Sequence, residues 1–477
     1  MSKQNFKSTY KENAAYLDSV FGIGKNYDFV GRERIFAGHR AKFYFIDGFA
    51  NSAVLDRLFI YLAELPEINT INDAENFAAR HMPHTEATVQ RDLDQFIYAV
   101  MSGTVGIIID SIDSVGITID TRIYPMRSVS QSENDRVLRG AHDSFTETIK
   151  QNSTLIRRRI RDPRLTFERI TLGEISKTDV VVSYIDGKAD SEYVKELIAK
   201  IKSVKADALT LGQQSLAECL LHQGWYDPFP KFRYTERPDN AAAHLLEGSV
   251  IILTDTSPEA MILPTCLLDF MEDTNDYYLP PFTGSYLRIL RYLVFALTLL
   301  LTPTWYLLIT HVEWIPEWLN FILVDMECNM PILLQLYIVE LALDGLKLAS
   351  MNTPNSLNST FGVVGGLILG DFAVQIGWFV PEVIVYMAFV AIANFSQSSY
   401  ELGYAFKFMR ILLLTTTAIG GLIGYILGIV LIVTLAACNK TVNGKRNYLY
   451  PLIPFNAKVL KRHLVRERLR THDKSKR

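Results

Sequence analysis

The stretch ILLLTTTAIGGLIGYILGIVLIVTLAAC, residues 411–438, contains no Asp, Glu, Lys or Arg. A helix needs about 20 consecutive apolar residues to cross the hydrocarbon core of a bilayer, and this stretch is longer. The residues directly behind it are rich in Lys and Arg, and such a flank marks the cytoplasmic side of a spanning helix. The sequence therefore predicts that the C-terminal third of the chain lies in a membrane and that the chain ends in the cytoplasm.

The tail, residues 439–477, is strongly basic, although the net charge of the whole chain is close to zero. It holds 12 Lys and Arg against Glu467 and Asp473, a net charge of +10, whereas the complete chain of 477 residues carries −3. A basic cluster after a spanning helix is typical of a segment near anionic lipid headgroups. The tail lacks interleaved aromatic platforms for stacking bases. We therefore expect anionic lipid, and no nucleic acid, as the partner of the tail.

The four cysteines, Cys219, Cys266, Cys328 and Cys438, form no C-x-x-C pair. This spacing therefore signals neither a zinc site nor a redox motif, the sequence predicts no metal-binding residues, and the cysteines suit a reducing compartment. The N-terminal segment has no apolar core of the kind that signal peptides carry. We expect the first 280 residues to remain in the cytoplasm, so that both termini lie on one side and the number of crossings is even.

The first 280 residues have the pattern of an α/β region with two small subdomains, 1–135 and 136–280. In the first, the apolar runs 105–110 and 115–120 predict a β-hairpin. Helical periodicity covers residues 53–65 and 85–101.

The second subdomain alternates between helical and extended patterns. A helix is predicted near 141–161 and a strand at 180–185, followed by a helix that carries Val194, Leu197 and Ile201 on one face. A further buried strand is predicted at 250–253. This alternation favours a small mixed sheet covered by helices.

Residues 281–438 are predicted to form an α-helical polytopic membrane domain of about four spans. The four apolar stretches are 292–310, 361–380, 383–400 and 410–438. The fifth stretch, 330–348, carries Glu340, Asp344 and Lys347 at i, i+4 and i+7, on one helical face.

A span that faces lipid on all sides would not tolerate these charges, and a fifth crossing would place the basic tail outside. We therefore expect residues 330–348 to form a re-entrant or interfacial helix, or one packed against a water-filled path. One observation opposes this topology, because it places Lys407 and Arg410 on the outer side.

No catalytic signature stands out, and the sequence predicts neither an enzyme nor a cofactor. Glu340, Asp344 and Asp371 are candidate residues of an ion pathway, because an acid at membrane depth is costly unless it is paired, protonated or hydrated. The alternative for each is a pair with a Lys or Arg. Asn394 is expected to hydrogen-bond between helices.

Gly420, Gly424 and Gly428 recur at intervals of four and predict close helix packing. The sequence leaves open whether the partner helix belongs to the same chain or to a second copy. The Gly-rich run 362–370 also favours close packing over nucleotide binding, because it lies within an apolar stretch.

Several motifs follow one another along the chain in a distinctive order. They are RRRIRDPRL (157–165), LGEISKTD (172–179), YIDG (184–187), PFP (228–230), TERPD (235–239), DYY (276–278), TPNSL (353–357), VVGG (363–366) and SYELG (399–403). In this order they resemble the A-subunit family of spore germinant receptors. The resemblance covers nearly all of the chain from about residue 140. Asp371 departs from the pattern of ordinary receptor A subunits, which speaks against direct nutrient sensing.

The resemblance implies a multi-pass protein of the spore inner membrane that acts in germination. It also implies a ring-forming, ion-conducting homo-oligomer that works with other germination membrane proteins, a small membrane partner among them. The alternative is a non-conducting scaffold that organises such proteins.

Overall fold

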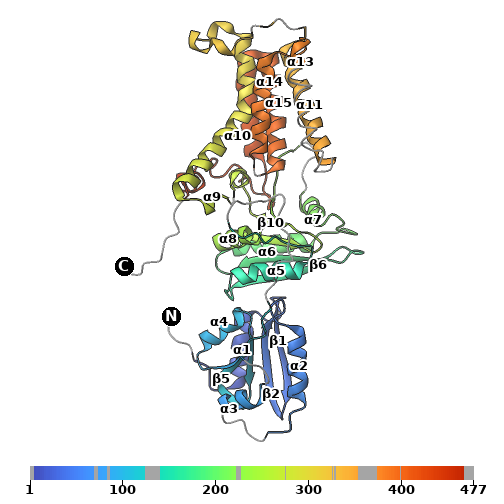
Figure 1. Cartoon of the computed structure of the whole chain (residues 1–477), viewed down its shortest axis with the longest axis vertical. Coiled ribbons are helices and arrows are strands. Elements are labelled where there is room, and N and C mark those ends of the chain that lie inside the picture. The colour runs from blue at the N-terminus through green and yellow to red at the C-terminus, as the bar shows by residue number, and fades with distance from the viewer. Residues whose placement is uncertain are drawn as a thin grey trace, which may run out of the picture. The chain divides into compact units, whose positions relative to one another are not determined.

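The computed structural model describes residues 5–68, 74–82, 86–123, 140–221, 227–273, 275–324, 326, 329–352, 373–397 and 399–466. The chain divides into two compact units, residues 1–223 with 232–264 and residues 224–231 with 265–477. The first unit contains two β-sheets, and the second contains the long apolar helices (Figure 1).

The first sheet has the strand order β1-β2-β4-β5-β3, with all neighbouring pairs antiparallel. Side chains alternate across its plane. Phe43 and Phe45 of β2 pack with α2 and α3, whereas Tyr44 and Ile46 pack with α1 and α4. The elements are α1 (Tyr10–Phe21), β1 (Phe29–Phe36), β2 (His39–Ile46), α2 (Ser52–Ala63), α3 (Ala74–His81), β3 (Ala87–Gln90), α4 (Leu93–Met101), β4 (Val105–Ile109) and β5 (Ile112–Ile119).

The second sheet has the order β6-β7-β9-β10-β8 and is antiparallel throughout. Its core joins Phe167 and Val181 to Ile156 of α5 and Leu245 of α8. The elements are α5 (Ile149–Arg159), β6 (Leu165–Leu172), β7 (Thr178–Ile185), α6 (Ser191–Lys202), α7 (Gln213–Leu220), β8 (Arg233–Thr235), α8 (Pro238–Glu247), β9 (Val250–Thr254) and β10 (Ala260–Leu263).

Arg157 of α5 connects the two sheets. Its side chain is fully buried, and Nε and Nη2 donate to the carboxylate oxygens of Asp28 at 2.8 and 3.1 Å. The guanidinium lies between the rings of Phe29 and Phe167, and Nη1 donates to the Leu165 carbonyl at 2.9 Å. A buried guanidinium needs such complete pairing, so this contact fixes how the two sheets meet.

The second unit is built around a helix bundle of α10, α11, α14 and α15 (Figure 1). The apolar side chains of Trp305, Leu336, Val383 and Leu414, one from each helix, share one core. The elements are η1 (Leu267–Met271), α9 (Asn275–Tyr278), α10 (Pro281–Thr310), η2 (Val312–Trp314), η3 (Glu317–Ile322), α11 (Ile332–Asn352), α13 (Ala373–Gln375), α14 (Pro381–Phe395), α15 (Tyr400–Cys438) and α16 (Ala457–Leu464).

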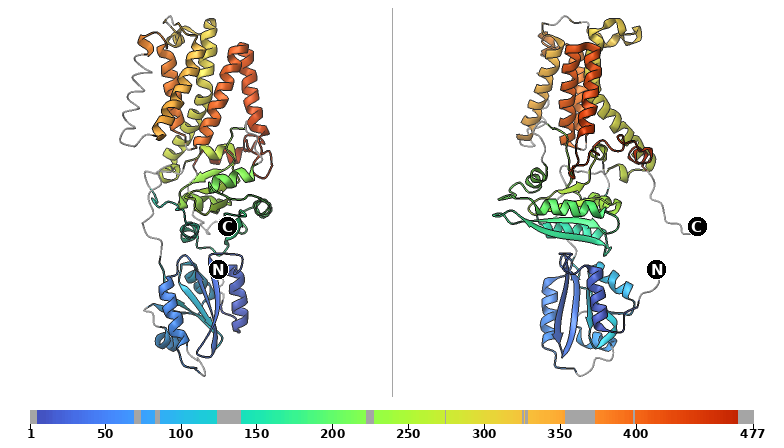
Figure 2. Two further views of the ribbon diagram at one scale, coloured as in Figure 1. Left: turned by 90° about the vertical axis from the view of Figure 1, so that its right-hand side faces the viewer. Right: turned by 180° about the vertical axis from the view of Figure 1, so that it is seen from behind.

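The chain reverses direction inside α15. Gly421 has φ 54° and ψ −132°, a conformation outside the helical region that glycine adopts easily. A Cβ added to Gly424 would overlap the carbonyl oxygen of Thr416, eight positions away. In one straight helix these residues would lie about 12 Å apart. Residues 400–420 and 422–438 are therefore two antiparallel legs, which Figure 2 shows side by side at the red end of the colour scale.

The predicted single helix over 410–438 is therefore wrong, since the apolar stretch continues through a reversal at Gly421. Within the described residues, α10 and α15 are long and apolar enough to cross a membrane, and residues 381–394 form a shorter apolar helix. The count of four spans is not confirmed. Residues 330–348 are predicted to form a re-entrant or interfacial helix, or one packed against a water-filled path. In the structure, α11 is a continuous helix that packs on α14 within the bundle.

In the first unit, the predicted hairpin over 105–120 is confirmed as β4 and β5. The helix predicted over 85–101 is wrong in its first half, because β3 pairs with β5 there and the helix begins at Leu93, after the N-cap Asp92. The mixed sheet predicted for the second subdomain is also wrong, because neighbouring strands are antiparallel in both sheets. Residues 265–280, expected in the second subdomain, group with the second unit.

We predict that Arg157→Met destabilises the first unit by about 3–5 kcal/mol, because it leaves the Asp28 carboxylate buried without its partner. Arg158→Met is the matched control, since the neighbouring Arg158 side chain is exposed. This substitution should change the free energy of unfolding by less than about 0.5 kcal/mol. Urea-dependent proteolysis of both variants in the intact chain measures the difference. Equal resistance of the two variants would contradict the role of Arg157.

Candidate functional site

Arg410 lies at the centre of the bundle. Its side chain is 2 % exposed, although it belongs to the apolar α15. Nη2 contacts Oε1 of Glu340 on α11 at 2.6 Å, and Nη1 donates to the carbonyl oxygen of Thr298 on α10 at 3.0 Å. One guanidinium thus joins three helices.

Lys407 lies one turn before Arg410 on the same leg of α15. Its ammonium is 3.8 Å from Glu340 Oε1 and donates to the Asp344 carboxylate. The two acids follow each other at i and i+4 on α11 and the two bases at i and i+3 on α15, so both pairs project from one face of their helices. The four formal charges sum to zero, which lowers the cost of removing them from water.

A pocket of about 270 Å³ borders this cluster. Glu340, Asp344 and Lys407 form part of its wall, and Asn394 of α14 lines it as well. Lys347 also lines it, with its ammonium 4.8 and 4.5 Å from the ring centres of Tyr400 and Tyr404. The Asp344 side chain is 33 % exposed, whereas that of Glu340 is 10 % exposed. Both acids line the pocket, and Asp344 is the more exposed of the two.

The structure thus brings Glu340 and Asp344 together, and it places both beside basic partners. Asp371 lies outside the described residues. Asn394 accepts a hydrogen bond from Gln397 Nε2 at 3.3 Å, near the end of its own helix. Lys407 and Arg410 are not among the site residues predicted from sequence, because a single helix over 410–438 places them on the outer side.

The three glycines lie at and after the reversal of α15. Gly424 and Gly428 face Thr416 and Leu413 of the first leg of the same chain. Among the described residues, no atom lies within 4 Å of a Cβ added to Gly420. Two of the three glycines therefore allow the two legs of α15 to approach each other.

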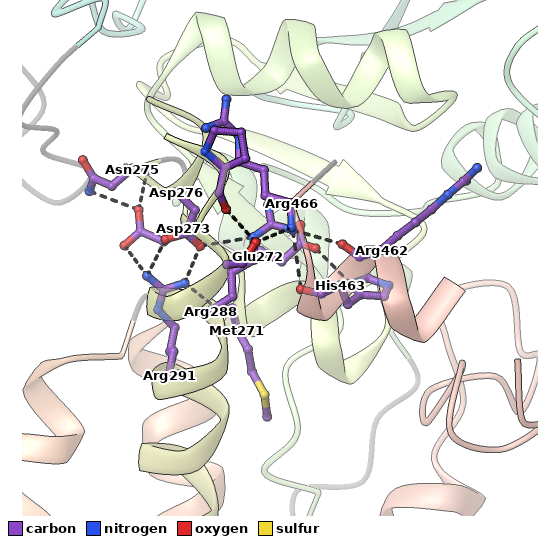
Figure 3. A network of polar contacts seen from close by, with 12 residues as sticks. Met271, Glu272, Asp273, Asn275, Asp276, Arg288, Arg291, Arg462, His463 and Arg466 are labelled. Atoms are coloured by element: carbon purple, nitrogen blue, oxygen red, sulfur yellow. Dashed lines mark hydrogen bonds and ion pairs between the residues drawn. The ribbon is translucent and has the colours of Figure 1, made fainter. Parts of the chain in front are cut away.

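A second polar network surrounds Asp276 at the base of α10 (Figure 3). The Asp276 side chain is fully buried and accepts from Arg291 Nη1 at 2.8 Å and Nη2 at 3.2 Å. Arg288 Nε lies 3.5 Å from the same carboxylate. Arg291 also pairs with Asp273 at 3.4 Å. These contacts attach Asp273 and Asp276, which precede α10, to the first turns of α10.

The same network also makes hydrogen bonds to α16. Arg288 Nη1 donates to the carbonyl oxygens of Arg462 and His463 at 3.1 and 3.4 Å, at the end of α16. His463 Nδ1 lies 2.9 Å from Glu272 Oε1. Burial lowers the pKa of His463, but the hydrogen bond to Glu272 and the negative charges of Glu272 and Asp269 together outweigh this effect, so the pKa lies above its ordinary value. Burial raises the pKa of the nearby Asp269 carboxyl, and the charge of Glu272 adds to this effect.

A family model described as "Bacillus/Clostridium GerA spore germination protein" matches residues 15–477. Stage V sporulation protein AF of Bacillus subtilis (strain 168) is 34% identical over 459 residues, which cover 95% of this chain and 92% of that protein. Spore germination protein KA of the same organism is 27% identical over 432 residues, 90% of this chain and 78% of that protein.

Among solved structures, the N-terminal domain of the A subunit of the Bacillus megaterium spore germinant receptor GerK3 aligns at 25% identity. The alignment has a TM-score of 0.41 and covers 55% of this chain and 97% of that chain.

We predict that Gly424→Leu disrupts the pairing of the two legs of α15, because the added side chain meets the backbone of Thr416. Overpacking of this kind costs about 1–3 kcal/mol, and more where backbone must move. Gly420→Leu is the matched control, because its Cβ meets no atom of the described residues within 4 Å. Thermal unfolding in detergent should show a lower Tm for Gly424→Leu alone. A Tm equal to that of Gly420→Leu would contradict the close approach.

Proposed function

The chain belongs to the GerA family of spore germination proteins, and we propose that it acts in germination as a subunit of an oligomeric, ion-conducting assembly of the spore inner membrane. The released ions would be monovalent cations. In this role the chain is a membrane protein without catalytic activity. The two-sheet unit would lie in the cytoplasm and take part in assembly or gating.

The observation that carries the proposal is the charged cluster beside the pocket. Ionisable side chains within an apolar helix bundle are rare, and they mark ion paths or structural pairs. Glu340 is enclosed between Lys407 and Arg410, which suits a structural pair. Asp344 combines partial exposure with a place in the pocket wall, so it is the residue of the cluster best placed to meet a hydrated ion.

The reversal at Gly421 also alters the proposed topology. The helices α10, α11 and α14 and the two legs of α15 supply five candidate crossings. The sequence predicts a further crossing over 361–380, of which residues 361–372 lie outside the described residues. With that crossing the number would be six. An even number keeps the basic tail in the cytoplasm, as the positive-inside rule favours, and it leaves both termini on that side. Lys407 and Arg410 then no longer lie outside the membrane.

A homo-oligomer is part of the proposal, because closed symmetry among several copies would create a shared path between them. Other germination membrane proteins, one of them small, are the proposed partners. The basic residues of α16 and the tail would lie against anionic lipid of the cytoplasmic leaflet.

A non-conducting scaffold is the second candidate, and one observation favours it. The four charges of the cluster neutralise each other within the chain, so they create no net attraction for cations. A scaffold would use them only to hold helices together.

Potassium release from liposomes that contain the purified protein distinguishes these candidates. We predict flux above that of empty liposomes and a several-fold reduction in Asp344→Asn, because the substitution removes the more exposed of the two acidic charges in the pocket wall. Asp371→Asn is expected to reduce flux as well. Glu317→Gln is the control, since Glu317 is an exposed acid of η3, away from the pocket.

The mass of each variant in detergent must accompany the flux measurement. An assembled wild-type protein without flux would contradict the channel and favour the scaffold. Wild-type flux in an assembled Asp344→Asn variant would contradict the assignment of the pocket to the ion path.

A further inference from the structure

Cys266, Asp269 and His463 gather where η1 meets α16, within the second unit. One potential ligand atom from each residue lies within 4.8 Å of the other two. The Cys266 Sγ to Asp269 Oδ2 distance is 3.0 Å. Thiolate, carboxylate and imidazole are the three side-chain ligands that proteins use for zinc.

Local structure fixes two of these side chains. Cys266 is the N-cap of η1 and Asp269 is its third residue, and the Cys266 N–H donates to Asp269 Oδ2 at 2.7 Å. The next N–H, that of Leu267, donates to the Tyr448 carbonyl at 2.8 Å. This connection ties η1 to the segment that leads into α16.

The third side chain is oriented by a carboxylate. His463 belongs to α16, which Arg288 holds through the carbonyl oxygens of Arg462 and His463 (Figure 3). Because the His463 Nδ1 and Glu272 Oε1 are 2.9 Å apart, Nδ1–H can donate to Glu272 and leave the lone pair of Nε2 free. A carboxylate that orients a histidine in this way is the usual second partner of a metal-binding imidazole.

The charges of this set also suit a divalent ion. A thiolate, a carboxylate and a neutral imidazole would bring two negative charges to Zn²⁺, so the complex would be neutral in a partly buried place. A fourth ligand, a water molecule, would complete the tetrahedral coordination that zinc prefers.

We infer that Cys266, Asp269 and His463 bind a zinc ion, with Glu272 orienting His463, and that the ion fastens α16 to η1 at the base of α10. The inference is independent of ion conduction. Its pattern, C-x-x-D with a histidine almost 200 positions later, differs from the paired-cysteine spacings by which zinc sites are predicted from sequence.

Zinc content of the full chain tests the site. The protein is purified in detergent without a histidine tag, stripped with a chelator, and reloaded with Zn²⁺ and separately with Co²⁺. We expect one Zn²⁺ per chain and, with Co²⁺, the charge-transfer absorption of a thiolate ligand. Cys266→Ser should abolish that absorption, and His463→Gln should weaken zinc binding strongly. Glu272→Gln should weaken it about 10–100-fold.

Cys438→Ser is the matched control, because Cys438 is exposed and remote from the cluster in sequence; it should bind like the wild type. Gel filtration establishes that each variant remains folded. Less than stoichiometric zinc in the folded wild type, or undiminished binding in both Cys266→Ser and His463→Gln, would overturn the site. A Co²⁺ spectrum that changes in Cys438→Ser instead would also overturn it.

Discussion

The second unit depends on how an enclosed guanidinium is neutralised. Arg410 is surrounded by apolar helices, where an unpaired charge costs several kcal/mol even after relaxation. Its contacts with Glu340 on α11 and with the Thr298 carbonyl on α10 supply the compensation. These contacts constrain three helices at once. The Lys407 pairs with Glu340 and Asp344 extend the same constraint by one helical turn towards the pocket.

The helix α10 carries partners of both polar networks. Arg288 and Arg291 bind Asp276 and the end of α16 at its base, while Thr298 accepts from Arg410 two turns further along. The two legs of α15 pack against the same helix. A displacement of α10 would therefore disturb the buried ion pairs and the attachment of α16 together, which makes this helix the natural place for a gating movement in the proposed assembly.

The sequence was informative where one local signal dominated. Alternating apolar runs predicted the hairpin of β4 and β5, and the motifs around Arg157 indicated the family that the family model confirms. The sequence was misleading where tertiary contacts determine the local structure. Residues 87–90 have helical periodicity, yet they form the strand β3 because they pair with β5. The Gly420-Gly421 pair is a turn signal, but its apolar surroundings suggested one long span. The same error left Lys407 and Arg410 out of the predicted site. These bases pair with Glu340 and Asp344 from residues 400–420, which form a separate leg.

A double-substitution cycle on Glu340 and Arg410 tests most directly whether their pairing holds the bundle together. Thermal stability is measured in detergent for Arg410→Met, Glu340→Met and the combined variant. Each single change should cost about 3–5 kcal/mol, because it leaves a buried charge without its main partner, and the combined variant should recover much of that loss, because two apolar side chains replace the pair. Single variants as stable as the wild type, or a combined loss equal to the sum of the single losses, would contradict the account.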